Sequence, residues 1–436
     1  MPWELVIWLI SVLLFLALLS QWYWQPRAPF WLRTVKSSPL RWYLIGYPLT
    51  VCRIHLTWRQ LCLNTDLAVI RRTRYTAVNR DVMVRGIPIR PIPPRLGLVR
   101  PTRTGFTVRV HLHPGQTPAQ FIACADAFTH AWRIHSIRIV STKRGEVVMI
   151  ATVRDPLGDP ESAWRKFPAP RLLAAPVGRI ADGSAWVMDL RAVPHWLVTG
   201  ATQSGKSTLV AALVTGLGTQ PVAILGIDLK GGMELGLFEK RLSALATTRA
   251  QAISLLRKVL DDLLRRMEIC RADGVRSIWE LDTGERPVPM VIVVDEIAEL
   301  YLSGGDPAAR KEAAECSTLL LRIAQIGAAL GVHLVIAAQR FGSDLGPGAT
   351  ALRAQLGGRI CHRVHDEATA EMTLGDLSPD AVTVAQAITE QEKGVAVTTI
   401  GGQWTRARSM LVTPDQARQH SAANAHHAPA LGELNG

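Results

Sequence analysis

The chain has 436 residues, of which 48% are hydrophobic and 19% charged, and its formal net charge is +13. This length allows at least one large core and favours two domains. The six cysteines are scattered without C-x-x-C spacing. That pattern argues against a disulfide framework or a cysteine metal site and predicts buried free thiols in a reducing compartment.

The positive charge is concentrated at the N-terminal end of the chain. Residues 1–100 contain 14 Arg and Lys against three acidic residues, a net of +11, which leaves +2 for the rest. A partner for the positive charge is therefore to be sought in this first segment.

Residues 3–24 are almost wholly apolar, with Trp and Tyr at both ends. This length spans a bilayer and the aromatic residues suit its two interfaces, so we predict a transmembrane helix over 3–24 within a membrane anchor over 1–65. A signal peptide fits less well, because no basic residue precedes the run and no small-residue cleavage site follows it. The following basic residues place the rest of the chain in the cytoplasm, at the cell (cytoplasmic) membrane: Arg27, Arg33, Lys36 and Arg41.

A second apolar stretch, 40–63, is interrupted by Arg53, His55 and Arg59. An interfacial or re-entrant helix fits these charges better than a second span, although a hairpin of two spans stays open. A basic, proline-rich linker is predicted over 66–104. Its arginines suit anionic lipid headgroups better than direct contact with DNA, and its prolines make it stiff.

A small α+β domain is predicted over 105–155. It begins with an alternating strand at 106–112, continues with a helix over 117–134, and ends with strands at 136–140 and 146–153. Residues 156–176 are predicted to be a second linker.

Strands and helices alternate beyond residue 177, which predicts an α/β domain with a doubly wound parallel sheet over 177–413. The predicted strands are 196–199, 222–228, 290–295, 333–339, 359–364 and 395–400, and the helices are 208–214, 252–267 and 313–329. Residues 414–436 are predicted to be a disordered tail.

Between the first of these strands and its helix, the sequence has the pattern G-x-x-x-x-G-K-[ST] of a phosphate-binding loop. The predicted nucleotide-binding residues are Gly200, Ala201, Thr202, Gln203, Ser204, Gly205, Lys206, Ser207 and Thr208. The glycines let backbone N–H groups point at the β-phosphate, Lys206 reaches the β/γ-phosphates, and the Ser207 hydroxyl ligates Mg²⁺. The chain is therefore predicted to bind a nucleoside triphosphate, with ATP and Mg²⁺ as cofactors.

An acidic pair follows the apolar run 290–294. Asp295 is predicted to hold the Mg²⁺ shell and Glu296 to polarise the attacking water, which favours hydrolysis over binding alone. Gln339, at the end of another apolar strand, is predicted to sense the γ-phosphate. A capping role for its side chain is an equal alternative.

Five ordered motifs together resemble the FtsK/SpoIIIE family of DNA translocases over about residues 105–413. They are the segments 194–207, 227–232, 293–300, 322–325 and 331–340. The resemblance implies an ATP hydrolase with a RecA-like P-loop motor domain, preceded by a small α domain. It further implies that a homo-hexamer ring pulls double-stranded DNA through a central pore.

Two departures from the family pattern limit what the resemblance implies. The family's interfacial arginine finger is replaced by Ala328, so Arg322 is the first candidate for that catalytic role, with Arg340, Arg359 and Arg363 as alternatives. The segment after Thr413 is too short for the winged-helix domain with which many relatives read DNA sequence.

The small membrane portion resembles the Tra proteins of actinobacterial plasmids and integrative elements, which move double-stranded DNA between cells. We therefore expect a conjugative DNA translocase. A chromosome-partitioning motor at a septum, a type VII protein-secretion ATPase and a coupling protein for single-stranded DNA are the alternatives.

Overall fold

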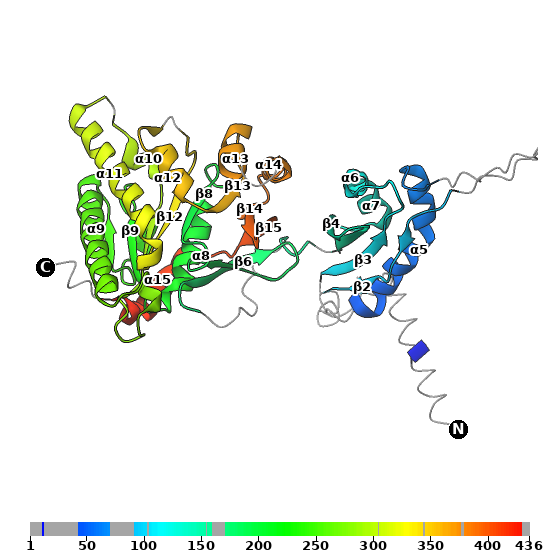
Figure 1. Cartoon of the computed structure of the whole chain (residues 1–436), viewed down its shortest axis with the longest axis horizontal. Coiled ribbons are helices and arrows are strands. Elements are labelled where there is room, and N and C mark those ends of the chain that lie inside the picture. The colour runs from blue at the N-terminus through cyan, green and yellow to red at the C-terminus, as the bar shows by residue number, and fades with distance from the viewer. Residues whose placement is uncertain are drawn as a thin grey trace, which may run out of the picture. The chain divides into compact units, whose positions relative to one another are not determined.

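The structure is a computed structural model that describes residues 11–12, 42–69, 91–102, 104–153, 155–158, 171–303, 305–342, 345–375 and 379–429. They belong to two compact units, Met1–Asp155 and Pro156–Gly436, which we call unit 1 and unit 2 and describe separately (Figure 1).

Unit 1 is an antiparallel sheet packed against helices. Its strands lie in the order β1-β3-β5-β4, with β2 also paired to β3. The strands are β1 (Arg95–Leu96), β2 (Arg100–Pro101), β3 (Gly105–His111), β4 (Ser136–Lys143) and β5 (Glu146–Thr152). The helices are the π-helix η3 (Trp42–Gly46), α5 (Tyr47–Asn64), α6 (Pro118–Ala123) and α7 (Ala125–Trp132).

An aromatic cluster forms the centre of unit 1. The ring of Trp58 on α5 stacks on Phe128 of α7 with 6.0 Å between centroids, and Trp132 lies 5.1 Å from Phe128 and 6.0 Å from Phe106 of β3. The Trp58 indole N–H donates to the carbonyl of Pro94 over 2.9 Å. Helix α5 is therefore part of the same core as the sheet.

This packing corrects the alternative of a second span at 40–63, because the described part of that stretch, from residue 42 on, belongs to the core of unit 1. The interfacial helix stays a prediction. Ile54, Trp58 and Cys62, at every fourth position, are buried in the core of unit 1. No helix among the described residues is long and apolar enough to cross a membrane. Apart from residues 11 and 12, the predicted span 3–24 lies outside the described residues.

Unit 1 also includes part of the predicted linker 66–104, since Leu67 and Val99 are buried in its core and β1 and β2 pair with β3. The single helix predicted over 117–134 is two helices that meet at Cys124, whose φ of −94° and ψ of 7° are not helical. The α+β domain therefore begins well before residue 105.

Unit 2 contains one ten-stranded sheet in the order β10-β9-β11-β12-β8-β13-β14-β15-β6-β7. The strands are β6 (Ala174–Ile180), β7 (Ala185–Asp189), β8 (His195–Thr199), β9 (Ala223–Ile227), β10 (Ala244–Ala246), β11 (Met290–Val294), β12 (Val332–Ala338), β13 (Gly358–His362), β14 (Val395–Ile400) and β15 (Gln403–Ser409). The α-helices are α8 (Lys206–Gly218), α9 (Arg249–Ala272), α10 (Ile297–Tyr301), α11 (Pro307–Ile326), α12 (Ala349–Gln355), α13 (Glu367–Leu374), α14 (Pro379–Gln386) and α15 (Pro414–Ala423).

The central strands of this sheet are covered on both faces. Along β11, Ile292 and Val294 join a core with α9, α11 and α12, whereas Val291 and Val293 join a core with α8. Figure 1 shows α9 beside α11. Burial on both faces explains the uninterrupted apolar run that predicted β11, because a parallel strand between two helix layers has no solvent face.

The sheet is mixed, which corrects the prediction of a parallel sheet throughout. In the order of the sheet, the six strands β10, β9, β11, β12, β8 and β13 are parallel to one another. Strands β14, β15, β6 and β7 follow β13, and each is antiparallel to the strand before it. The segment that forms β6 contains Pro176 and Gly178, and these residues led to its prediction as part of a linker. A Cβ on Gly178 would collide with the carbonyl of Arg408 on β15, so the close approach of two strands requires this glycine.

The predicted disordered tail 414–436 begins with helix α15, followed by a 3₁₀ turn η9 (Ala425–His427). Thr413 caps α15 by accepting the N–H of Gln416 over 3.3 Å, and Ala417 is buried against the core that holds α8. The prediction is therefore wrong for the described part of this segment, 414–429, whose composition, rich in Ala and His, gave no sign of a packed helix.

Replacing Trp58 by Ala should destabilise unit 1 by about 3–5 kcal/mol, because the change leaves a cavity in the aromatic cluster. Leu56→Ala, on the same helix at a side chain that is 76% exposed, should change the stability by less than about 0.5 kcal/mol. Urea denaturation of both variants measures the difference. Equal, small effects would contradict the placement of α5 in the core.

Candidate nucleotide site

The glycine-rich loop joins the carboxyl end of β8 to the beginning of α8. Strand β8 lies between β12 and β13 and is parallel to both, so the chain leaves the sheet at the carboxyl end of an interior parallel strand. Ligands of open α/β sheets bind at such positions. Gly205 is the N-cap residue of α8 and has no side chain to cap it, which leaves the first N–H groups of the helix available to an anion.

Close backbone packing fixes the shape of the loop. Gly205 has a φ of 115°, and a Cβ there would lie 2.5 Å from the Cα of Gly394. Gly394 donates its N–H to the Ser204 carbonyl over 2.9 Å. At the other end of the loop, a Cβ on Gly200 would lie 2.7 Å from the Cβ of the buried His362. Both glycines are therefore required by space as well as by conformation.

The Lys206 ammonium folds back onto its own loop. It donates to the carbonyl oxygen of Gly200 over 2.5 Å and to that of Ala201 over 3.3 Å. Burial lowers the pKa of Lys206, and the nearby Glu296 carboxylate opposes that shift. The carbonyl groups thus hold the cation at the place where phosphate oxygens would compete for it.

The two predicted acidic residues follow β11 at the same edge of the sheet. Both are 7% exposed. Burial, and next the charge of Asp228, raise the pKa of Asp295 from 3.8 to about 6. The Lys230 ammonium lies 3.8 Å from Oδ2 of Asp295 and 3.9 Å from Oε2 of Glu296.

Gln339 follows β12, the neighbour of β11, and the structure brings it to the acidic pair. Its backbone N–H donates to Oε1 of Glu296 over 3.3 Å, and the residue lines the cavity around the loop. The hydrogen bond to Glu296 is thus made by the backbone of Gln339 and not by its side chain. The γ-phosphate role of the Gln339 side chain stays a prediction.

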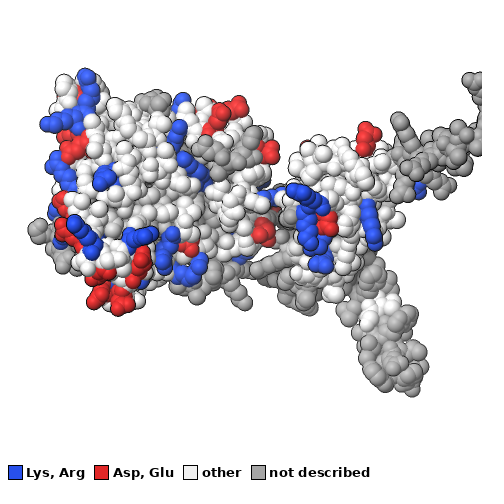
Figure 2. Space-filling view, in the orientation of Figure 1, with Lys and Arg blue, Asp and Glu red and all other residues white. Residues whose placement is uncertain are grey.

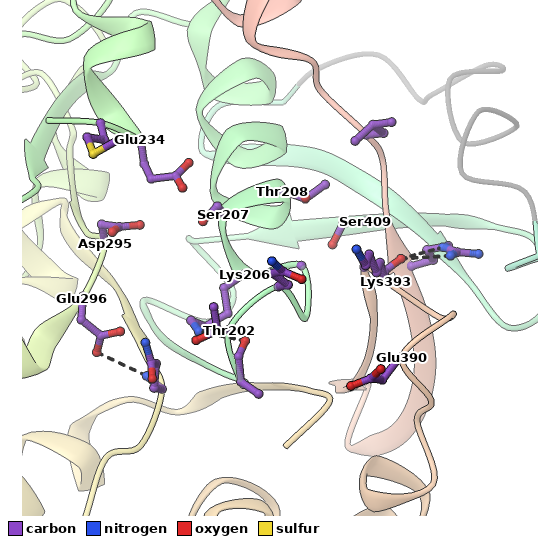
Figure 3. Close-up of a pocket in the computed structure, with 18 of the residues that line it drawn as sticks. Thr202, Lys206, Ser207, Thr208, Glu234, Asp295, Glu296, Glu390, Lys393 and Ser409 are labelled. Carbon is purple, nitrogen blue, oxygen red and sulfur yellow. Dashed lines mark hydrogen bonds between the residues drawn. The ribbon is translucent and has the colours of Figure 1, made fainter. Parts of the chain in front are cut away.

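These groups face one cavity of about 760 Å³, a size suited to a nucleotide. Figure 3 shows Asp295 and Glu296 on one side of the phosphate loop and Lys393 and Ser409 on the other. Sequence reasoning missed this second wall, which comes from the residues around β14 and β15: Glu390, Gln391, Lys393, Gly394, Arg408, Ser409 and Leu411.

Arg408 fixes that second wall. Its Nε and Nη2 groups donate to the Lys393 carbonyl over 3.1 and 3.0 Å, which sets the turn that presents Lys393 and Gly394 to the loop. In the sequence, this turn at 393–394 is indicated only by Gly394, which directly precedes the predicted strand 395–400. Nothing in the sequence connected it with a loop about 190 residues earlier.

None of the arginine-finger candidates is itself among the residues that line the cavity. Arg322 is exposed on α11, and Arg359 is mostly buried in β13, where it donates to the Arg353 carbonyl over 3.0 Å. Arg363 forms an ion pair with Glu390 at 3.5 Å. The catalytic role of Arg322 stays a prediction.

The cavity residues fit a nucleotide with Mg²⁺. Ser207 and Asp295 bring a hydroxyl and a carboxylate to the same cavity, and both are the hard oxygen donors that Mg²⁺ prefers. Oε2 of Glu296 is buried and has no hydrogen-bond partner among the described residues, as expected of a group that acts on a ligand.

Comparison with known proteins places the chain. Residues 30–153 match the actinomycete conjugal transfer protein N-terminal domain, and residues 161–286 and 279–343 match the FtsK/SpoIIIE family. The transfer protein TraSA of Streptomyces ambofaciens is 39% identical over 356 residues, which cover 78% of this chain and 85% of that relative. The chain belongs to the FtsK/SpoIIIE family, in the branch of the actinomycete transfer proteins.

More distant relatives agree with this assignment. The DNA translocase FtsK of Staphylococcus epidermidis is 28% identical over 247 residues, which cover 52% of this chain and 29% of that protein. Among solved structures, the monomer form of the pCW3 conjugation coupling protein TcpA with ATPγS has a TM-score of 0.56 at 21% identity, and the match covers 76% of this chain and 93% of that chain. Unit 2 is thus a P-loop ATPase fold.

Replacing Glu296 by Gln should leave nucleotide binding intact and slow ATP hydrolysis by roughly 10²–10⁴-fold, because the amide cannot polarise water. Glu299→Gln, one turn away on α10 and outside the cavity lining, is the matched control. Nucleotide affinity and single-turnover hydrolysis measure both steps. Hydrolysis at the control rate would remove Glu296 from the catalytic role.

Proposed function

We propose that the chain is an ATP-driven translocase that moves double-stranded DNA from cell to cell in conjugation, and that it works as a homo-hexamer ring. The observation that carries the proposal is the assembly of phosphate loop, acidic pair and Gln339 around one cavity, in a chain similar over most of its length to a conjugal transfer protein. ATP and Mg²⁺ are the proposed cofactors.

The charge of unit 2 supports a motor that holds DNA weakly through each subunit. Residues 156–436 contain 28 Arg and Lys against 30 Asp and Glu, a net charge of −2. Figure 2 shows basic and acidic side chains interspersed on the visible face of unit 2. Phosphate contacts are therefore few per subunit and add up around a ring, which gives affinity without sequence preference.

Duplex DNA should raise the ATP turnover of the full chain in detergent, with little dependence on sequence and a steep loss as salt is raised. The stimulation should appear only at protein concentrations where the chain oligomerises. Single-stranded DNA and small acidic secreted proteins are the rival activators in the same assay. Stimulation by a rival alone would replace duplex transport with single-strand coupling or protein secretion.

We further propose that the apolar run 3–24 attaches the chain to the cell membrane, with both units on the cytoplasmic side. The length of the run and the basic residues after it support this proposal.

Deleting residues 3–24 should release the chain from membranes that are washed with carbonate, because the apolar attachment is lost, whereas the full chain should need detergent. Fractionation of expressing cells followed by immunoblotting measures this. Release of the full chain by carbonate would exclude a span at 3–24, with no bearing on the stimulation by DNA.

A further inference from the structure

Lys230 lies in a loop that is held rigidly from inside the protein. The loop follows β9 and leads into the 3₁₀ helix η5 (Leu235–Phe238). The fully buried Asp228 accepts the N–H of Lys230 at Oδ1 over 3.1 Å, and those of Glu234 and Leu235 at Oδ2 over 3.0 and 3.1 Å. Three amide donors satisfy this carboxylate without a cation and fix the backbone from which Lys230 projects.

The side chain of Lys230 extends from this loop to the acidic pair. Its Nζ lies 3.8 Å from Asp295 and 3.9 Å from Glu296, whose side chains are 7% and 6% exposed. Lys206, the other lysine beside the pair, donates to the carbonyl groups of its own loop instead. Among the described residues, Lys230 therefore has the positive charge nearest to these two carboxylates, which have little access to water.

The ion pairs of Lys230 with Asp295 and Glu296 are long and partly exposed to solvent. Both distances exceed the length of a hydrogen bond, and the Lys230 side chain is 42% exposed. An ammonium group so placed can move into solvent at little cost, whereas the carboxylates remain where β11 holds them.

We propose that Lys230 is the counter-cation of Asp295 and Glu296 in the empty site and that it competes with the divalent metal for this position. Entry of the metal displaces the ammonium group into solvent, and the position of the Lys230 side chain thereby reports occupancy of the site, whereas the loop backbone stays where Asp228 holds it. Lys230 is then a positioning residue. The proposal rests on the metal–nucleotide site of the proposed function and is independent of the polymer that is moved.

A lysine that only solubilises the surface would affect neither the metal affinity nor the stability of the empty site. Competition requires that removal of the ammonium group strengthens metal binding, because two cations no longer repel each other. It also requires that the empty site becomes less stable, because two buried carboxylates lose their counter-charge. These opposite signs distinguish competition from a general loss of folding, which would weaken metal binding.

The test uses the full chain without nucleotide and the variants Lys230→Met and Lys230→Arg, with Lys240→Met as the matched control. Lys240 is an exposed lysine outside the cavity lining. Mn²⁺ replaces Mg²⁺, and its free concentration is followed by electron paramagnetic resonance. Lys230→Met should bind Mn²⁺ roughly three- to tenfold more tightly than the control. Lys230→Arg should bind as the unsubstituted chain does.

Thermal melting provides the second measurement. In the presence of EDTA, the melting temperature of Lys230→Met should lie roughly several degrees below that of Lys240→Met. Mn²⁺ should restore most of the difference. If the methionine variant does not fold, Lys230→Gln keeps a polar head without the charge and serves in its place. Mn²⁺ affinity that is unchanged or lower than in the control would overturn the proposal. Neither measurement involves hydrolysis or DNA, so a failed DNA assay leaves this test unaffected.

Discussion

The nucleotide site depends on the contact between two backbones that are distant in the sequence, at Gly205 and Gly394. A phosphate loop can direct its N–H groups inward only if its own path is fixed, and here that path is fixed by van der Waals contact and by the hydrogen bond from Gly394 to Ser204. Any side chain at Gly205 would separate the two segments. The antiparallel strands β14 and β15 are thus part of the nucleotide site, because they hold the turn against which the loop rests.

The parallel strands supply the other half of the site through their order. The carboxyl ends of β9, β11 and β12 follow one another along one edge of the sheet, so Asp228, Asp295 and Gln339 lie at the same edge although more than a hundred residues separate the first from the last. Each residue then has a different environment. Amide donors satisfy Asp228, whereas the acidic pair faces the cavity.

The predictable parts of this protein were those with a local pattern. The loop 200–208 and the strand that ends before Asp295 could be recognised because their residues are consecutive and because phosphate and metal binding allow few residue types at these positions. Strands β6 and β15 could not, since a Pro–Gly segment and an Arg-rich segment become strands only by pairing with their neighbours in the sheet: β15 pairs with β14 and β6, and β6 pairs with β7. The apolar face of α5 left a second span open for a related reason: burial against Phe128 and burial in lipid require the same residues.

Helix α15 gives the carboxyl-terminal segment a mechanical connection to the site. The ring of His420 covers Gly218, the last residue of α8, so closely that a Cβ there would lie 2.5 Å from it. The Ser421 hydroxyl accepts the N–H of Arg241, whose guanidinium donates to the Gly218 carbonyl over 2.6 Å. Helix α8, which begins at the phosphate-binding loop, is therefore held at its far end by α15. A displacement of residues 414–423 would act on the carboxyl-terminal end of α8.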